Sequence, residues 1–273
     1  MIDASQAPST SDTPVFELSG VSLRFGKVNA LENLNLRVTQ SEQVAVIGPS
    51  GAGKTTLLRM LAAVLKPTHG RVLALGRDTA AIHGRALREL RRRIGFIYQN
   101  DNLIPQLRVV HNVLMGRLPL WWFPKAIFSL FWPQEVQRAR DALREVELEH
   151  RLWAQPDEMS GGQQQRVAIA RLLVQRPEVI LADEPVSQLD MRLGREVVQL
   201  LKTVAQRQGS TLIVNLHSLD LLQGNFTRVI ALRDGKIFWD GPPAKLNKDV
   251  LRDIYGAEYR ALHLEELALE ASP

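Results

Sequence analysis

The sequence predicts an α/β fold: a mostly parallel sheet with an additional antiparallel β layer and an inserted helical subdomain. Three observations support this prediction. Apolar runs of strand length alternate with helical patterns over much of the chain, as in a parallel sheet. Three imperfectly alternating runs near the N-terminus are typical of antiparallel strands. A long interval in the middle shows helical spacing but no strand pattern.

The first elements form the antiparallel layer and the start of the parallel sheet. Turn formers separate the three N-terminal strands, which we place at Val15 to Leu18, Val21 to Phe25 and Leu34 to Val38. A buried strand follows at Gln43 to Ile47, and a helix at Thr56 to Leu65. We expect the Pro- and Gly-containing segment Lys66 to Gly70 to end that helix.

Further buried strands continue the parallel sheet, and we place them at Ile94 to Tyr98, Val179 to Ala182, Thr211 to Leu216 and Val229 to Leu232. No strand pattern occurs from Asn100 to about Pro156. An amphipathic helix is indicated there by Val136, Ala139, Leu143 and Val146. We therefore expect a tail at 1–14, one globular domain at 15–257 with a helical subdomain inserted at about 100–175, and a second tail at 258–273.

Composition limits the compartment and the cofactor classes. The chain is 45% hydrophobic and 23% charged, as in an ordinary soluble protein, and it has no cysteine. Disulfides and thiolate metal sites are thereby excluded. The N-terminus lacks a signal-peptide pattern, and no apolar run reaches the roughly 20 residues of a membrane span. We expect a cytosolic protein, or one peripheral to a membrane that other subunits build.

The net charge of +5 raises the question of a polyanionic partner. Arginines are concentrated between Arg85 and Arg93, which could indicate nucleic acid or anionic lipid. The alternative is a solvated helix whose Leu87 and Leu90 contact the core. We favour the helix and expect no nucleic-acid partner.

The strongest motif connects the strand ending at Ile47 to the helix after it. Its glycines let the backbone wrap closely around an anion, and the helix N-terminus adds partial positive charge. This strand, loop and helix order is that of a P-loop, so we expect ATP to bind here. Lys54 should contact the β- and γ-phosphates, and Thr55 should ligate Mg²⁺. The predicted nucleotide-binding residues are Gly48, Pro49, Ser50, Gly51, Ala52, Gly53, Lys54, Thr55 and Thr56.

Two carboxylates end another predicted strand. An apolar strand capped by acids is common, but beside a P-loop Asp183 becomes the expected Mg²⁺ partner. Glu184 is then placed to orient or deprotonate the attacking water. His217 follows the strand Thr211 to Leu216, so it should lie at the same carboxyl edge and contact the γ-phosphate.

A second glycine motif begins another helix. Ser160, Gly161, Gly162 and Gln163 precede a helical pattern and form a candidate anion site, with Ser160 as cap or phosphate ligand. Two such helix starts in one chain cannot easily face the same γ-phosphate. This motif therefore suggests a second subunit.

Together these motifs resemble the nucleotide-binding subunit of ABC transporters over about residues 15–243. The resemblance implies a P-loop NTPase fold, Mg²⁺ and ATP as cofactors, and a head-to-tail dimer in which Ser160 to Gln163 of one copy faces the P-loop of the other. It implies that Gln99 senses γ-phosphate and Mg²⁺ and that Phe25 stacks on adenine, although a core role for Phe25 stays open. Ser187 to Asp190 resembles the loop that couples the two sites. Gln188 and Met159 depart from the usual residues but remove no chemical group.

Several stretches resemble phosphonate importer ATPases in particular. They include Gln99 to Leu103, Asn112 to Leu118 and Ile230 to Gly241, together with Pro185 and Val186. The implied protein is a peripheral subunit on the cytoplasmic face of the inner membrane, bound to permease subunits and indirectly to a solute-binding protein. Another solute, or a lipid or lipoprotein system, remains an alternative because these stretches do not contact the solute.

Two other classes of protein were considered, and one aromatic cluster has no assigned role. A DNA-repair or chromosome-maintenance ATPase would carry a long coiled coil before Ser160, and no sustained heptads occur there. A protein that binds ATP as a switch without hydrolysing it should lack the carboxylate or the histidine, and this chain has both, as Glu184 and His217. The aromatic cluster from Trp121 to Trp132 could pack inside the helical subdomain or dock a permease helix.

Overall fold

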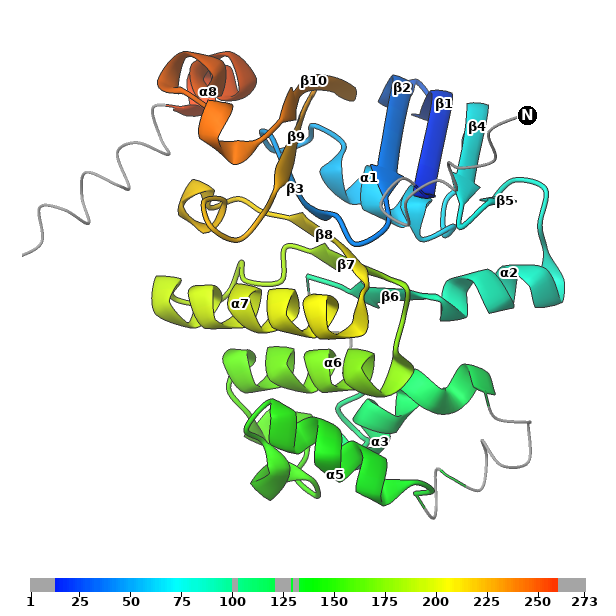
Figure 1. The fold of residues 1–273 in the computed structure, drawn as a ribbon, viewed down its shortest axis with the longest axis vertical. Coiled ribbons are helices and arrows are strands. Elements are labelled where there is room, and N and C mark those ends of the chain that lie inside the picture. The colour runs from blue at the N-terminus through cyan, green and yellow to red at the C-terminus, as the bar shows by residue number, and fades with distance from the viewer. Residues whose placement is uncertain (1–12, 100–102, 121–128, 130–132, 260–273) are drawn as a thin grey trace, which may run out of the picture.

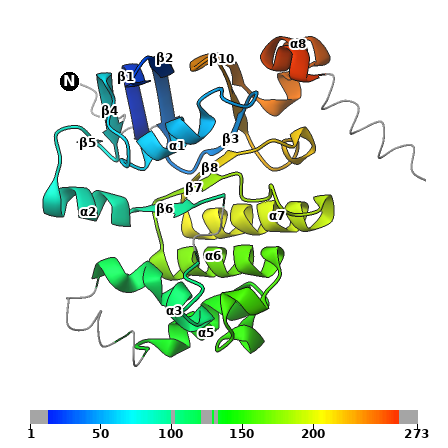
Figure 2. The same ribbon diagram turned by 180° about the vertical axis from the view of Figure 1, so that it is seen from behind.

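The computed structural model describes residues 13–99, 103–120, 129 and 133–259. Figures 1 and 2 show an antiparallel layer at one end of the molecule and helices α3, α5 and α6 at the other, with the main sheet between them. Within the described part, no helix is both long enough and apolar enough to cross a membrane. The aromatic residues of the Trp121 to Trp132 cluster lie outside the described residues.

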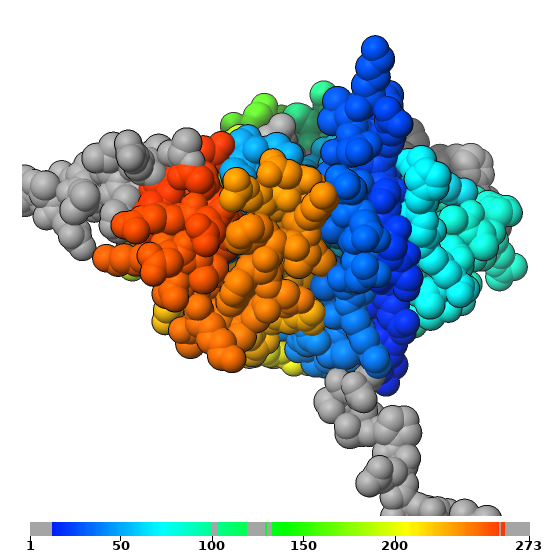
Figure 3. All heavy atoms as spheres, turned by 90° about the horizontal axis from the view of Figure 1, so that it is seen from above, coloured from blue at the N-terminus to red at the C-terminus, as the bar shows by residue number. Residues whose placement is uncertain are grey.

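The antiparallel layer is a four-stranded sheet in the order β2-β1-β4-β5. Its strands are β1 (Pro14–Phe25), β2 (Val28–Thr39), β4 (His69–Ala74) and β5 (Arg77–Asp78). The first two predicted strands are one continuous strand, β1. Ser19 and Gly20 do not end it; they cause only an irregularity in its register between Leu18 and Val21. In Figure 3, β1 and β2 (blue) lie between β4 (cyan) and the part of the chain after about residue 228 (orange).

The main sheet has six strands in the order β10-β9-β3-β8-β7-β6. They are β3 (Gln43–Ile47), β6 (Ile94–Ile97), β7 (Val179–Asp183), β8 (Thr211–Asn215), β9 (Arg228–Arg233) and β10 (Lys236–Gly241). All neighbours pair in parallel except β9 and β10, so the predicted parallel sheet is confirmed. The edge strand β10 was not predicted, although Asp234 and Gly235 before it form a common two-residue hairpin loop.

The buried strands separate two hydrophobic cores. Val44 and Val46 of β3 pack with the antiparallel layer and α1, whereas Ala45 and Ile47 pack with the helices on the other face. Successive side chains of a strand point to opposite faces, so a strand covered on both faces is apolar throughout. This explains why β3 gave a continuous apolar run in the sequence.

Helix α1 (Lys54–Leu61) is shorter than predicted, and the prediction of its end at Leu65 was wrong. Ala63 has a left-handed φ of 54°. The N–H of Val64 donates to the carbonyl of Arg59 at 2.9 Å, and the N–H of Ala63 donates to Met60 at 2.9 Å. These two bonds form a Schellman motif, which ends a helix without needing the proline that follows.

The helices that follow β6 and precede β7 in the sequence pack as one group. They are α3 (Val109–Leu114), η2 (Met115–Leu120), α5 (Val136–Glu145), η3 (Glu149–Arg151), η4 (Pro156–Glu158) and α6 (Gly161–Gln175). Ala139, Leu143 and Val146 are fully buried, which confirms the amphipathic pattern. No strand occurs among the described residues of this interval.

The remaining helices of the described residues are α2 (Gly84–Arg92), α7 (Met191–Gln208), η5 (Leu219–Leu221), η6 (Pro243–Lys245), α8 (Lys248–Tyr255) and η7 (Gly256–Glu258). Helix α2 is the solvated helix expected from the arginine-rich segment: Leu90 is fully buried, Leu87 packs against the same core, and Arg85 and Arg88 are exposed.

Candidate functional site

The loop between β3 and α1 can be formed only with glycine at two positions. Gly48 has a φ of 139°, and a Cβ there would lie 2.0 Å from the carbonyl oxygen of Leu232. Gly53 has a φ of 98°, and a Cβ there would lie 2.6 Å from the carbonyl oxygen of Ala30. Both positions combine a positive φ with close backbone contact, so any side chain would distort the loop.

Lys54 begins α1 and is only 5% exposed. Its Nζ donates to the carbonyl oxygens of Gly48 at 2.7 Å and Pro49 at 3.0 Å. Burial lowers the pKa of Lys54, and the negative charges of Glu184, Glu258 and Asp183 oppose that shift. The ammonium is thus a buried cation bonded to neutral oxygens, which phosphate oxygens can replace.

Asp183 ends β7 and is 3% exposed. Its Oδ1 accepts hydrogen bonds from Thr55 Oγ1 at 3.0 Å and from Asn215 Nδ2 at 2.7 Å. The structure therefore brings the predicted Mg²⁺ partners Thr55 and Asp183 together. No group of three or more His, Cys, Asp or Glu side chains in the described ranges could hold a metal alone. One hydroxyl and one carboxylate fit a Mg²⁺ ion that also binds phosphate oxygens and water.

Glu184 follows Asp183 with a left-handed φ of 50°, and its N–H donates to the carbonyl of Asn215 at 3.2 Å. Its Oε2 accepts from Gln99 Nε2 at 2.9 Å, and its Oε1 lies 2.6 Å from His217 Nε2. Three predicted catalytic side chains thus form one hydrogen-bonded group at the carboxyl edge of the main sheet. An ionised carboxylate only accepts hydrogen bonds, so Nε2 of His217 carries the hydrogen in this arrangement.

The second glycine motif caps its own helix. Ser160 Oγ accepts from the N–H of Gln163 at 3.4 Å, and Gln163 Oε1 accepts from the N–H of Ser160 at 3.2 Å. This capping box confirms the predicted start of α6. No hydrogen bond within the described ranges connects Ser160 or Gln163 to the P-loop or to Glu184.

The loop from Ser187 to Asp190 lies between the carboxylates and this second motif. Ser187 Oγ donates to the carbonyl of Glu184 at 3.2 Å, and Asp190 Oδ1 accepts from the N–H of Leu193 as the cap of α7. A Cβ on Gly161 would lie 3.6 Å from Leu189 Cδ2, so this loop covers the start of α6. The loop is therefore in contact with both motifs within one chain.

Phe25 is the last residue of β1 and is 51% exposed. A core role for this phenylalanine, left open by the sequence, is therefore excluded. Its half-exposed ring can contact a planar group.

Two residues that contact the site were missed from the sequence. Asn215 is the fully buried last residue of β8 and donates to Asp183, as described above. A polar residue at the end of a buried strand, two positions before His217, was the signal for it. Glu258 Oε2 accepts from the N–H of Ser50 in the P-loop at 3.3 Å. Nothing in the sequence indicates that contact.

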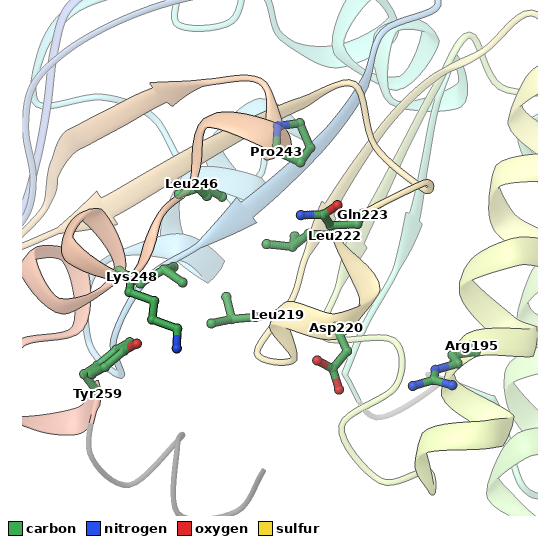
Figure 4. Close-up of a pocket in the computed structure, with 10 residues that line it drawn as sticks. Arg195, Leu219, Asp220, Leu222, Gln223, Pro243, Leu246, Lys248 and Tyr259 are labelled. Carbon is green, nitrogen blue, oxygen red and sulfur yellow. The ribbon is translucent and has the colours of Figure 1, made fainter. Parts of the chain in front are cut away.

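Tyr259, which follows α8, borders a cavity of about 510 Å³ between η5 and α8. In Figure 4, Lys248 and Tyr259 lie on one side, Asp220 and Arg195 lie on the other, and Leu219 lies between them. The lining combines positive and negative side chains with leucines. The residues after α8 therefore contact the P-loop on one side and border this cavity on the other.

Comparison with known sequences gives consistent matches. A family model described as ABC transporter matches residues 31–187. The phosphonates import ATP-binding protein PhnC of Pseudomonas putida is 42% identical over 252 residues, which cover 92% of this chain and 94% of that protein. PhnC 1 of Pseudomonas aeruginosa is 46% identical over 229 residues, covering 84% and 86%.

Solved structures share the fold. An ATP-binding cassette in a dimeric post-hydrolysis state with ADP and Pi has a TM-score of 0.71 and 36% identity, covering 84% of this chain and 98% of that one. The cbiO1 protein of Clostridium perfringens, part of the ABC transporter complex cbiONQ, has a TM-score of 0.74 and 26% identity, covering 93% and 100%.

Proposed function

The chain belongs to the ABC transporter family, and on that premise we propose that it is the ATP-hydrolysing subunit of an importer for phosphonates or a related phosphorus oxyanion. The observation that carries the hydrolytic part is the position of Glu184. Its carboxylate is held by Gln99 at 2.9 Å and His217 at 2.6 Å, at the edge of the sheet that carries the P-loop.

Binding begins with the phosphates of ATP. They replace the carbonyl oxygens that now accept from Lys54, and the amides at the start of α1 direct their hydrogens at the same charge. Burial of Lys54 strengthens this interaction, because a charge pair removed from water is screened less. Phe25 contributes the contact with adenine.

Mg²⁺ would be held by Thr55 and Asp183, with Gln99 as a further oxygen ligand, and when bound it neutralises charge on the β- and γ-phosphates. The 3.0 Å hydrogen bond between Thr55 and Asp183 keeps both oxygens beside the loop before nucleotide arrives. Preorganised ligands of this kind need little rearrangement when the phosphates bind.

Hydrolysis needs a base that takes a proton from water as the water attacks the γ-phosphate. Glu184 has this role, and the His217 contact orients its carboxylate. The hydrogen on Nε2 can also be donated to a γ-phosphate oxygen once the carboxylate turns to the water. Gln99 holds the second carboxylate oxygen and, as the family resemblance implies, is the residue that faces the permease.

A second copy completes the site. Ser160, Gly161, Gly162 and Gln163 of that copy contribute a second positive helix start to the same γ-phosphate. The dimeric cassette among the similar structures supports this arrangement. Release of the cleaved phosphate after hydrolysis removes the shared anion, so the two copies separate after each cycle.

The transported solute is proposed from the relatives. The two Pseudomonas proteins are phosphonate import subunits by name, and they are alike to this chain over most of its length. The subunit would bind permease subunits at the cytoplasmic face of the inner membrane, with a solute-binding protein on the other side. No observation in the described residues favours another solute or a lipid.

Growth and purified activity test the two parts of the proposal separately. A deletion strain without a redundant importer should fail to grow on a phosphonate as sole phosphorus source and should recover with the wild-type gene. Unimpaired growth overturns the assigned solute. Absence of Mg²⁺-dependent ATP hydrolysis by the complex co-purified with its permease overturns the assigned enzyme.

A further inference from the structure

We propose that Asn215 is a positioning residue that holds Asp183 in place for Mg²⁺ and nucleotide. The inference rests on the proposed ATPase function and assigns a role to a residue that does not contact phosphate itself. It starts from the place of Asn215 in the main sheet. Asn215 ends β8, pairs with Val46 of β3 on one side, and pairs with Asp183 of β7 on the other.

The side-chain contact has one possible orientation. Asn215 is fully buried, and its Nδ2 lies 2.7 Å from Asp183 Oδ1. An ionised carboxylate has no hydrogen to donate, so the amide must present its NH₂ group. Asp183 Oδ1 then accepts from Asn215 and Thr55 together, which fixes the carboxylate in two directions.

This orientation leaves the other end of the amide without a partner. Asn215 Oδ1 is buried and accepts no hydrogen bond from the described residues. A buried acceptor without a donor is unfavourable and is usually satisfied by a protein group or an ordered water. The observation that carries the proposal is therefore the bond from Asn215 Nδ2 to Asp183, which holds this carboxylate together with Thr55.

The main chain of Asn215 makes a separate contact. Its carbonyl oxygen accepts from the N–H of Glu184 at 3.2 Å. A substitution at Asn215 keeps that carbonyl and removes only the bond to Asp183. The expected defect is therefore selective: the contribution of Mg²⁺ to nucleotide affinity falls, whereas binding through the P-loop is retained.

The test compares nucleotide affinity with and without Mg²⁺. The probe is a fluorescent, non-hydrolysable ATP analogue, titrated in Mg²⁺ and in EDTA. The readout is the dissociation constant in EDTA divided by the dissociation constant in Mg²⁺, which we call the Mg²⁺ ratio. Asn215→Leu keeps the same branched arrangement of heavy atoms, is somewhat larger, and cannot donate. We expect the ratio to fall by about tenfold, as for other residues that orient metal ligands. Affinity in EDTA should stay within about twofold of wild type.

A matched control lies on the same strand. Thr211 is also fully buried, and its Oγ1 accepts from the N–H of Ser41 at 2.9 Å at the opposite end of β8. Thr211→Val removes a buried hydrogen-bonding group far along the strand from Asp183. This variant should lower the melting temperature without changing the Mg²⁺ ratio.

Asn215→Ser keeps the test decisive if the leucine variant does not fold. Serine leaves room for water between its hydroxyl and Asp183, so a smaller fall in the ratio is expected. An unchanged ratio in a folded Asn215 variant overturns the proposal, and so does an equal loss of affinity in Mg²⁺ and in EDTA. Failure of the wild-type protein to bind the analogue at all contradicts the proposed function instead.

Discussion

The P-loop and the Ser160 to Gln163 motif are both glycine-containing helix starts, yet they differ in what surrounds them. Around the P-loop, one chain supplies the buried cation Lys54, the hydroxyl of Thr55 and the carboxylate of Asp183. At the second motif, the polar groups of Ser160 and Gln163 are bonded to each other. We propose that the first is a nearly complete phosphate site and that the second, which in this chain is a helix cap, receives an anion presented by another copy.

This difference shows that a helix N-terminus alone does not define where a ligand binds. The P-loop combines the helix start with a cation and a metal ligand set, so it should hold nucleotide within a single copy. The second motif adds only partial charge and a serine hydroxyl. It should therefore contribute only when another copy presents the γ-phosphate.

The strongest way to break the comparison is to remove the cation from the P-loop. Lys54→Ala should lower the affinity for ATP and the rate of hydrolysis by at least about a hundredfold, because a buried charge facing the phosphates is lost. Lys66→Ala is the control, since Lys66 Nζ bonds to the Ala80 carbonyl at an exposed position just after α1. Nucleotide titration and phosphate release measure both variants, and near wild-type activity of Lys54→Ala would falsify the P-loop assignment.

The next variant should make the second motif measurable. Glu184→Gln should bind ATP normally and hydrolyse it at least about a hundredfold more slowly, because an amide cannot accept the proton from water. The persisting γ-phosphate should then hold two copies together. Light scattering with and without ATP checks for this homodimer, and a monomer at saturating ATP means that the permease supplies the missing affinity.

Ser160→Arg, added to Glu184→Gln, separates the two motifs directly. The bulky side chain would enter the trans half of the site, so the dimer should be lost while ATP binding through the P-loop persists. The single Ser160→Arg variant, titrated with ATP, controls for damage to the P-loop half. A double variant that still dimerises shows that Ser160 to Gln163 is not the trans ligand.

A smaller effect should identify how the P-loop half holds adenine. Phe25→Ala should weaken ATP binding by about tenfold, as expected when a base loses one aromatic stacking partner. Phe238→Ala is a matched control, because Phe238 is 47% exposed and Phe25 is 51% exposed. Equal affinities of the two variants would mean that Phe25 does not contact adenine.

The smallest effect concerns the carboxylate at the rim of the P-loop. Glu258 lies 3.3 Å from the N–H of Ser50 and adds negative charge where phosphate should bind. Glu258→Gln should therefore tighten ATP binding by about two- to threefold at low salt, with less effect at high salt because the residue is exposed. Glu145→Gln, which breaks an exposed ion pair with Arg207, is the control. A weaker affinity in Glu258→Gln would mean that the glutamate supports the loop instead.

The sequence was most informative where one local rule determines both structure and chemistry. Gln43 to Ile47 was placed with its observed bounds, because a strand covered on both faces is apolar throughout. The P-loop glycines, Glu184 and His217 follow from motifs at the ends of such strands, and Gln99 follows from the family resemblance; the structure then joins the last three by hydrogen bonds. These features depend on few residues that are close in sequence or at one sheet edge.

Features that depend on distant contacts were harder to predict. The end of α1 depends on a left-handed Ala63, which no residue preference indicates. Strand β10 lies at an edge and has partly exposed side chains, so its pattern is weak. Glu258 is far from Ser50 in the chain, and only folding reveals that they meet.

The hydrogen bonds of Lys54 have a consequence for product release. Its ammonium donates to the Gly48 and Pro49 carbonyls at 2.7 and 3.0 Å within the loop that it belongs to. Phosphate arrival therefore exchanges one set of oxygen partners for another, and departure reverses that exchange. The carbonyls of the loop keep this ammonium paired in the protein interior, where an unpaired charge would be costly. Because the loop itself supplies the replacement partners of Lys54, ADP should leave without a slow rearrangement of the loop. The subunit should then be able to bind the next ATP at once.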